Sequence, residues 1–316
     1  MKAKKSSKME LRKSVEIIGC LPASSRALVG GLYWSGMPEE AGGGRKAMNI
    51  ISLGAGVQST TMLLMAAHGE ITPKPDYAIF ADTGWEPKKV YQHLEWLKKE
   101  AAKFGIKVIV TQEKNIKDDL LFAINSESKT GKAGFTNLPF HLINKDGTRG
   151  MAKRQCTAEY KIRPIQKKIR ELLGYKPRQR IKEKVTLWMG ISTDEIQRVK
   201  PSREKWIEHR WPLIEKRMNR LDCLSWMERK GYPQPPKSSC VGCPFHNDAL
   251  WLDMKLNDKE AWEEAVEMDR AIKKLHRLKG KPYLHGSCQP LDEVYLHENQ
   301  ITIDLFDNEC EGMCGV

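Results

Sequence analysis

Apolar segments of strand type and of helix type alternate along the chain from residue 48, and this alternation limits the fold more than any other feature. Four segments have the composition of buried strands: residues 49–53, 77–81, 106–110 and 185–189. Three intervening segments have helical spacing and end at a glycine: residues 59–68, 87–104 and 164–173. Alternating strands and helices predict a parallel sheet covered on both faces, which is a Rossmann-like, doubly wound α/β fold.

Composition divides the chain into three parts. Residues 1–47 begin with many lysines and end with a run of glycines, so we expect a poorly ordered leader there. Residues 48–210 carry the alternating pattern and form the predicted nucleotide-binding domain, interrupted by an irregular segment at residues 112–155. Residues 211–316 contain tryptophan, cysteine and helical patterns, which predict a smaller, helical, cysteine-rich C-terminal region.

The charge balance indicates a polyanionic partner. The chain has 53 Lys and Arg against 40 Asp and Glu, a net charge of +13, which suits either a nucleic acid or a phosphorylated small molecule. No segment has the roughly eighteen consecutive apolar residues that a membrane span needs. Seven of the eight cysteines lie beyond residue 150, a distribution that favours metal or redox chemistry in a reducing, cytoplasmic setting.

A glycine-containing loop joins the first predicted strand directly to a helix. Small residues let the backbone approach a phosphate, and the amides at a helix start bind anions. The loop lacks the Gly-Lys-Ser/Thr of a Walker motif, and its glycine spacing differs from the dinucleotide fingerprint. The predicted nucleotide-binding residues here are Ser52, Gly54, Ala55, Gly56, Gln58, Ser59 and Thr60. An ordinary strand-to-helix turn that needs small residues for packing is the alternative interpretation.

Two more polar loops follow predicted strands. Asp82, Thr83, Gly84 and Glu86 come after the second strand. Gly190, Asp194 and Arg198 come after the fourth strand. Because the carboxyl ends of parallel strands meet at one edge of a sheet, where ligands bind, the three loops together predict a nucleotide crevice.

These motifs, with the segment of residues 156–164, resemble the phosphoadenosine phosphosulfate (PAPS) reductase family over about residues 48–245. That family belongs to the PP-loop ATP pyrophosphatases, or adenine nucleotide alpha hydrolases, which also include tRNA-thiolating and DNA-phosphorothioating enzymes. The resemblance implies a nucleotide alpha-hydrolase fold that binds ATP or a related adenylate. Two positions depart from the family pattern: Gln58 replaces an acid that often helps to hold magnesium, and Ser192 replaces an arginine of sulfonucleotide reductases.

The cysteines suggest a metal or a redox site. Cys240 and Cys243 form a close pair that suits a metal or a disulfide. The resemblance implies that this pair and Cys156 bind a 4Fe-4S cluster through their thiolates. For the fourth ligand we expect Cys288, with Cys223 as second choice. A zinc site made by Cys240, Cys243 and His246 is the main alternative.

The C-terminal tail carries two more thiols. Glu309-Cys310 resembles in part the Glu-Cys-Gly element that holds the nucleophile of sulfonucleotide reductases. Its spacing to Cys314 permits a dithiol that accepts or releases sulfur. A tail without a chemical role is the alternative.

Basic residues concentrate at residues 129–184. Ten Lys or Arg and two acids lie at residues 161–184 alone, beside the predicted crevice, which indicates contacts with phosphates of a tRNA or DNA. Trp206 and Trp211, interleaved with basic residues, either stack on bases or pack in the core.

Taken together, these features predict an enzyme that binds ATP and exposes its α-phosphate to an oxygen of an acceptor, with pyrophosphate leaving and Mg²⁺ assisting. Sulfur held by the cluster or a cysteine, supplied by a donor protein, would then react with the adenylated acceptor. The expected catalytic residues are Gln58, Ser59, Asp82 and Cys310. A sulfonucleotide reductase that attacks through Cys310 and releases sulfite, and a non-catalytic nucleic-acid-binding module, are the alternatives.

Overall fold

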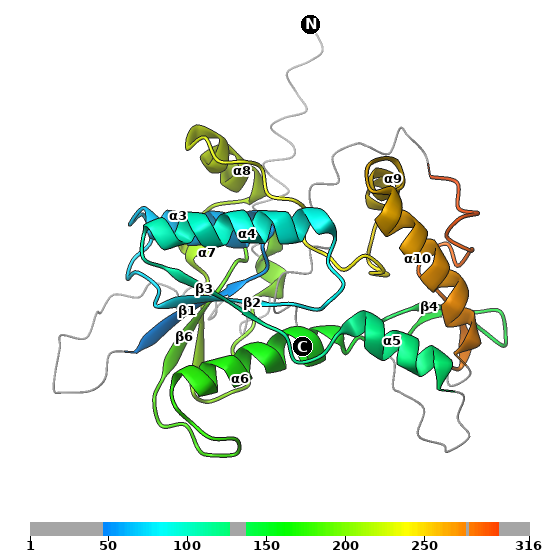
Figure 1. Ribbon diagram of the computed structural model, residues 1–316, viewed down its shortest axis with the longest axis horizontal. Helices are drawn as coiled ribbons and strands as arrows, with labels where there is room; N and C mark the ends of the chain where they lie inside the picture. Colours follow the sequence, from blue (N-terminus) through cyan, green and yellow to red (C-terminus); the bar gives the residue numbers. More distant parts are fainter. Residues whose placement is uncertain (1–46, 127–136, 276–277, 297–316) are drawn as a thin grey trace, which may run out of the picture. The chain divides into compact units, whose positions relative to one another are not determined.

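The computed structural model describes residues 47–126, 137–275 and 278–296 (Figure 1), and these belong to one compact unit that begins at Ala47. The predicted leader and the tail thiols Cys310 and Cys314 lie outside the described residues. In the part of the chain that the structure describes, no helix has the length and apolar character needed to cross a membrane.

A five-stranded parallel sheet forms the first layer, in the order β3-β2-β1-β6-β7. Its strands are β1 (Met48–Leu53), β2 (Tyr77–Ala81), β3 (Lys107–Thr111), β6 (Val185–Met189) and β7 (Ile207–Arg210). The predicted doubly wound α/β fold is therefore confirmed. Strand β7 was not predicted, because its residues Glu208, His209 and Arg210 are polar, as an edge strand allows.

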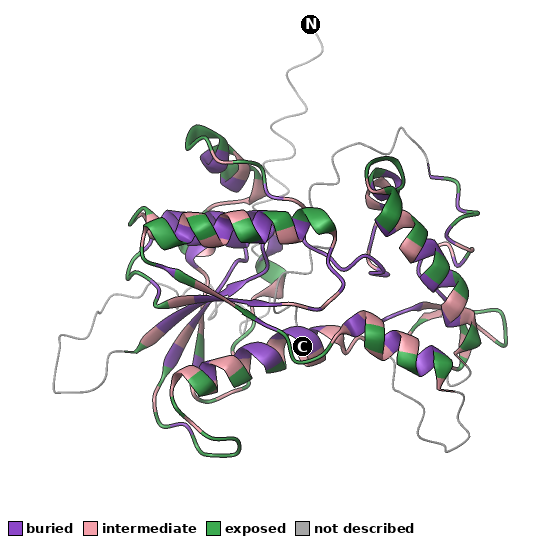
Figure 2. Ribbon diagram, viewed as in Figure 1, coloured by how far each residue is buried: buried purple, intermediate pink, exposed green. Residues whose placement is uncertain are grey.

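Helices cover both faces of this sheet (Figures 1 and 2). Helices α3 (Val57–Ala67) and α4 (Lys88–Lys103) pack with Ile51, while α6 (Arg163–Leu172) packs with Ile50 on the other face. Neighbouring strand residues thus bury their side chains on opposite faces, which explains why these strands are apolar throughout. The predicted helices start and end within two residues of the observed ones.

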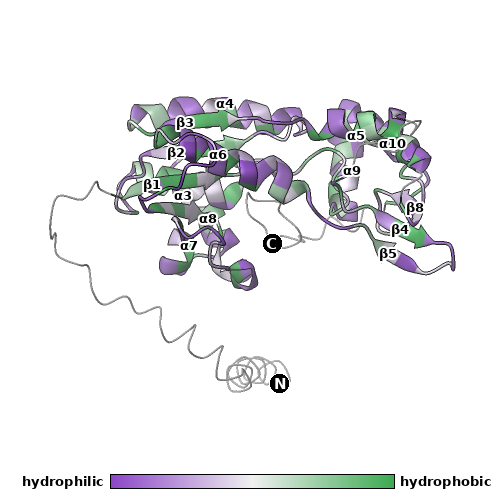
Figure 3. Ribbon diagram, turned by 90° about the horizontal axis from the view of Figure 1, so that it is seen from below, coloured by the Kyte–Doolittle hydropathy of each residue, from purple (hydrophilic) through white to green (hydrophobic). Residues whose placement is uncertain are grey.

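The segment at residues 112–155 is more regular than its sequence predicts. It contains α5 (Ile116–Asn125), β4 (His141–Asn144) and β5 (Arg149–Met151). Strand β4 also pairs, antiparallel, with β8 (Gly280–Tyr283), so the three strands form a second sheet (Figure 3). Such short strands have too few apolar residues to be recognised, and β8 lies more than a hundred residues away along the chain.

Helices α9 (Asp248–Asn257) and α10 (Lys259–Ala271) pack on one another, and their buried residues share a core with α5 and β4. Helices α7 (Pro212–Glu215) and α8 (Arg220–Arg229) instead join the core around α3. The remaining short helices are η1 (Ala158–Ile162, a π-helix), η2 (Thr193–Arg198) and η3 (Ile272–Lys274).

Candidate nucleotide-binding site

The glycine loop connects β1 to the start of α3 at the carboxyl edge of the parallel sheet. Ala55 adopts a left-handed conformation with φ of +58°, which is uncommon for a non-glycine residue. The Ser59 hydroxyl accepts a hydrogen bond from the Gly54 amide at 3.2 Å, and the Ser238 hydroxyl donates one to the Gly54 carbonyl. Helix α3 has neither a capping side chain nor an acid in its first turn, which suits an anion at its positive end.

The loop after β6 meets the glycine loop directly. The Gln58 side-chain amide donates to Glu195 Oε2 at 3.2 Å and to the Ser192 hydroxyl at 3.4 Å. Strand order reverses between β1 and β6, because β2 and β3 lie on one side of β1 and β6 and β7 on the other. Ligands of open α/β sheets bind at such a switch point. The structure thus brings two of the three predicted loops together at the place where this fold binds ligands.

An acid lies beside Gln58 even though residue 58 itself is neutral. The Glu195 carboxylate is buried and pairs with Arg198, one of the predicted phosphate ligands. Arg220, at the start of α8, donates to Gln58 Oε1 at 3.1 Å. Sequence reasoning missed Glu195 and Arg220 as site residues, although Glu195 lies in the motif that carried the prediction.

Asp194 has a structural contact in this arrangement. Its carboxylate accepts hydrogen bonds from the Ser192 hydroxyl and, at 3.2 Å, from the Arg220 amide. Asp194 therefore ties the loop after β6 to the first turn of α8. Gly190 connects β6 to this loop and is buried.

The loop after β2 is held by its own acid. Asp82 Oδ1 accepts from the Gly84 amide at 2.7 Å and from the Tyr91 hydroxyl at 2.8 Å. Burial, followed by the contact with Asp82, raises the pKa of Tyr91, so this phenol remains a proton donor at neutral pH. The parallel pairing of β1 and β2 puts this loop at the same edge as the glycine loop.

Glu86 lies in a buried polar cluster with a cysteine. Its Oε1 accepts from the Thr83 hydroxyl at 3.2 Å and lies 3.8 Å from the Lys161 ammonium. Cys240 Sγ lies 3.3 Å from the Thr83 hydroxyl and 3.8 Å from Glu86 Oε1. The side chains of Lys161 and Glu86 are only 7% and 1% exposed, so each neutralises the other's buried charge. This cluster joins the nucleotide edge to the cysteine pair, a contact that no local sequence pattern indicates.

Three of the predicted metal ligands, Cys156, Cys240 and Cys243, belong to one core. The Cys243 amide donates to the Cys240 carbonyl at 3.1 Å, and both side chains are buried. His141 contacts the Pro244 carbonyl at 2.9 Å, and the Cys156 side chain packs against the same core. Cys223 is buried in the separate core around α3, so the structure does not bring it to this turn.

Four of the five described cysteines are buried, and Cys156 is half-buried. None of the five described cysteines forms a disulfide. Among residues 47–126, 137–275 and 278–296, no three histidine, cysteine or acidic side chains are grouped so that they would hold a metal ion. Thiolates suit an iron–sulfur cluster or zinc chemically, so the metal site at these cysteines stays a prediction.

Two buried histidines near the site are neutral at physiological pH. Burial lowers the pKa of His93 to about 4, and its Nε2 lies 3.1 Å from the Thr60 hydroxyl in α3. Burial also lowers the pKa of His246 to about 3, and its Nε2 lies 2.8 Å from the Ser239 hydroxyl. His93 thus supports the helix that starts at the glycine loop, and His246 supports the segment that leads into the cysteine pair.

Comparison with known proteins finds likeness only among solved structures. No protein-family model matches the chain, and no curated protein matches it. One similar solved structure is the U34-tRNA thiolase NcsA from Methanococcus maripaludis with its 4Fe-4S cluster. It is 14% identical, the alignment covers 86% of this chain and 82% of that chain, and the TM-score is 0.38. A TM-score this low does not define the fold class of the chain. The fold class rests instead on the strand order and the helix layers described above.

Proposed function

We propose that the protein is a PP-loop enzyme that binds ATP at the β1–β6 switch point and adenylates an acceptor, with pyrophosphate as the leaving group. One observation supports this most directly: Gln58, from the glycine loop, contacts Ser192 and Glu195, from the loop after β6. The contact lies beside the uncapped start of α3, where amides favour a phosphate.

The chain's own residues account for the proposed reaction. An acceptor oxygen attacks the α-phosphorus, the bond to the bridging oxygen breaks, and pyrophosphate leaves with the electron pair. The first-turn amides of α3 stabilise the negative charge on the leaving group. Arg198, paired with Glu195, lies at the same edge and orients the phosphates. Bound Mg²⁺ would neutralise phosphate charge, with Asp82 and Glu195 as the carboxylates at this edge.

Sulfur transfer to the adenylated acceptor is the second half of the proposal: a sulfide-level sulfur attacks the atom that bears the adenylate, and AMP leaves with the electron pair of the broken bond. Cys240 supports it, because its thiol contacts Thr83 and Glu86 of the loop after β2. A sulfur atom delivered to this turn by a donor protein would lie next to the nucleotide edge. The net charge of +13 favours a nucleic acid as the acceptor.

A single anaerobic assay separates the three interpretations. The full chain is incubated in turn with ATP, PAPS and its 3′-dephosphorylated analogue, each with and without tRNA or DNA. Pyrophosphate release from ATP that depends on the nucleic acid supports the proposal. Release of sulfite from a sulfonucleotide supports the reductase alternative. Absence of nucleotide binding by calorimetry, with salt-sensitive nucleic-acid binding retained, supports the non-catalytic module.

The predicted 4Fe-4S cluster is tested separately by metal analysis after anaerobic purification. Stoichiometric iron that is lost in Cys240→Ser and Cys243→Ser, but retained in Cys223→Ser, supports the cluster. Cys223 is a suitable control because it is also buried but lies in another core. A colourless protein with stoichiometric zinc supports the zinc site, and a metal-free protein with active sulfur transfer contradicts both.

A further inference from the structure

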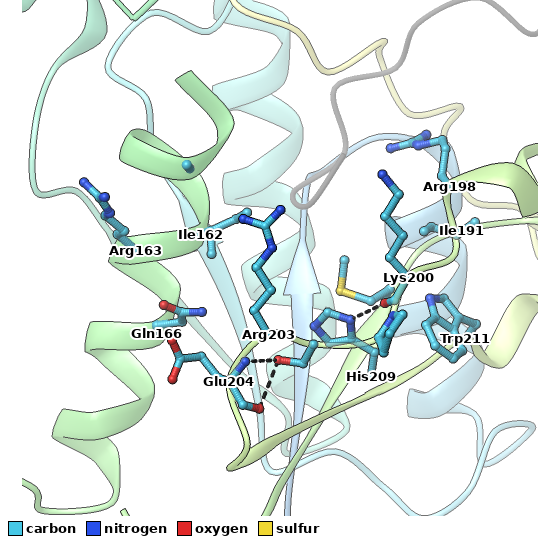
Figure 4. Close-up of a pocket in the computed structure, with 14 residues that line it drawn as sticks. Ile162, Arg163, Gln166, Ile191, Arg198, Lys200, Arg203, Glu204, His209 and Trp211 are labelled. Atoms are coloured by element: carbon cyan, nitrogen blue, oxygen red, sulfur yellow. Dashed lines mark hydrogen bonds between the residues drawn. The ribbon is translucent and has the colours of Figure 1, made fainter. Parts of the chain in front are cut away.

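A pocket of about 220 Å³ lies between α6 and residues 199–206, the segment that joins η2 to β7 (Figure 4). Figure 4 shows Arg163 and Gln166 on one side of this pocket, Lys200 and Trp211 on the other, and Arg203 between them. The end of β6, at Met189 and Ile191, contributes to its wall. The pocket therefore opens at the same sheet edge as the proposed nucleotide crevice.

A second cavity, of about 830 Å³, is lined by residues 179–184 and 203–206 and by Arg170. Arg203 and Glu204 line both cavities. The cationic residues of the two cavities together are Arg163, Arg170, Arg180, Lys182, Lys184, Arg198, Lys200, Arg203 and Lys205. We call these two neighbouring, cation-lined cavities the basic groove.

Carboxylates are scarce along the basic groove. Glu183 and Glu204 are the acids that line it, and Glu204 accepts a hydrogen bond from the Trp206 indole at 3.0 Å. Within the described residues, the exposed side chains of Lys200 and Arg203 form no salt bridge. Arg163 and Arg198 already pair with Glu159 and Glu195. An external anion would therefore chiefly neutralise other cations of the groove, such as Lys200 and Arg203.

Aromatic side chains border the end of the basic groove near β7. His209 donates from Nδ1 to the Lys200 carbonyl at 2.9 Å, and burial lowers its pKa, so its ring adds no charge at neutral pH. The Trp211 ring packs edge-on against His209, with ring centroids 6.2 Å apart. An aromatic platform next to cations is the combination that proteins use to bind unpaired bases and their phosphates.

We propose that the basic groove binds the sugar-phosphate backbone of an unpaired nucleic-acid strand, which leads the acceptor nucleotide to the β1–β6 crevice; this second part rests on the proposed function. Arg163 and Arg170 are seven residues apart on α6, a span of about 10 Å at 1.5 Å per residue. That span matches about three phosphates of a stacked strand, whose charges repeat about every 3.4 Å. A phosphorylated small molecule would fill the smaller pocket and leave the cations of the larger cavity unneutralised.

The test uses the full chain with two charge-matched double variants. Lys200→Gln with Arg203→Gln removes two groove cations. Lys89→Gln with Lys99→Gln removes two exposed cations from α4, on the other face of the sheet. Binding of fluorescein-labelled tRNA and of a single-stranded DNA oligonucleotide is measured by anisotropy between about 50 and 200 mM salt.

We expect the groove variant to bind both probes at least tenfold more weakly at about 100 mM salt, while the α4 variant stays within twofold of the wild type. The slope of log K against log salt should decrease by about 1.4 to 1.8 in the groove variant, since two phosphate contacts are lost. Equal losses in both variants, unchanged binding in the groove variant, or equal competition by polyglutamate of the same charge would overturn the proposal.

Calorimetry with ATP distinguishes this proposal from the proposed function. ATP affinity should be unchanged in the groove variant, because neither substituted residue belongs to the proposed nucleotide site. If the wild type binds the probes through the basic groove but does not bind ATP, the groove assignment stands and the proposed enzymatic function is wrong.

Discussion

At the scale of single residues, the family pattern has an acid at position 58, and in this protein an acid from another loop lies beside that position. Gln58 is neutral, but Glu195 approaches it to 3.2 Å from the far side of the strand-order reversal. Arg198 pairs with this buried carboxylate, so the loop after β6 brings an ion pair next to Gln58. The neutral residue at position 58 is therefore no evidence against the proposed reaction, because a neighbouring loop brings an acid to it.

Replacing Glu195 tests this assignment. We expect Glu195→Gln to reduce the rate of pyrophosphate release from ATP by roughly a hundredfold, the order of effect seen when a preorganised electrostatic group is removed. The control is Glu208→Gln, an exposed acid on β7. The rate is measured with saturating acceptor and a range of Mg²⁺ concentrations. Unchanged kinetics in Glu195→Gln would show that its carboxylate serves only to hold Gln58 and Arg198.

The buried histidines predict a pH dependence of stability. Free histidine titrates near 6.5, while the folded-state pKa of His93 is about 4 and that of His246 about 3. The unfolded chain therefore binds more protons below pH 6.5, so these residues leave stability unaffected above that pH and reduce it as the pH falls toward 4. The loss amounts to as much as about 1.4 kcal/mol per proton and pH unit.

Urea unfolding between pH 4 and 8 measures this effect. Wild type and His93→Gln are compared, because other groups titrate equally in both proteins. The variant is expected to be less stable at pH 7 but to lose less stability on acidification, by about one proton near pH 5. Parallel stability curves for the two proteins would contradict a neutral, buried His93.

At the scale of elements, α8 packs in the same core as α3 and also contacts the glycine loop. Asn219 and Asp222 form a reciprocal capping box at its start, with both hydrogen bonds at 2.9 Å. Arg220, which follows Asn219, donates a hydrogen bond to Gln58. The helix cap therefore positions a side chain of the proposed nucleotide site.

We expect Asn219→Ala to cost about 1 kcal/mol of stability, as the loss of a helix cap usually does, and to weaken ATP binding several-fold. Asn247→Ala is the matched control, because Asn247 caps α9 through the Leu250 amide at 3.0 Å. The control should show a similar loss in urea unfolding, with unchanged ATP affinity by calorimetry. An equal change in ATP affinity in both variants would argue against a specific link through α8.

At the scale of the whole molecule, Trp85 joins the nucleotide edge to the cysteine-containing part. The Val241 amide donates to its carbonyl at 2.8 Å, and its indole donates to Glu264 of α10 at 2.6 Å. Gly242 packs directly on the ring, where a Cβ atom would lie 2.1 Å from Trp85 Cη2. We therefore expect a change at this contact to affect both the nucleotide edge and the cysteine-containing part.

Gly242→Ala is therefore expected to destabilise the protein by about 1 to 3 kcal/mol, the usual cost of overpacking, and to lower ATP-dependent activity. Gly286→Ala is the control, since its nearest neighbour would lie at an ordinary 3.7 Å. Hydrogen exchange should report faster exchange in α10 and in the loop after β2 for Gly242→Ala. Wild-type exchange rates in both segments would contradict the predicted connection through Trp85.

The parallel sheet was predictable because its strands are buried on both faces, so Ile50, Ile51 and their neighbours form unbroken apolar runs. The glycine loop was predictable for a similar, local reason, since small residues between a strand and a helix have few other uses. Strands β4, β5 and β8 were not predicted. These strands are short, and β4 pairs with β8, which lies far along the chain, so no local sequence pattern reveals the sheet.

The sequence by itself determined the elements of the parallel sheet, the order of its loops and the excess of positive charge, because each of these depends on neighbouring residues or on composition. Only the tertiary structure decided which side chains meet: Glu195 with Gln58, Lys161 with Glu86, and Cys240 with Thr83. These pairs join distant parts of the chain, and burial of a charge or a thiol is stable only when the complete fold supplies its partner.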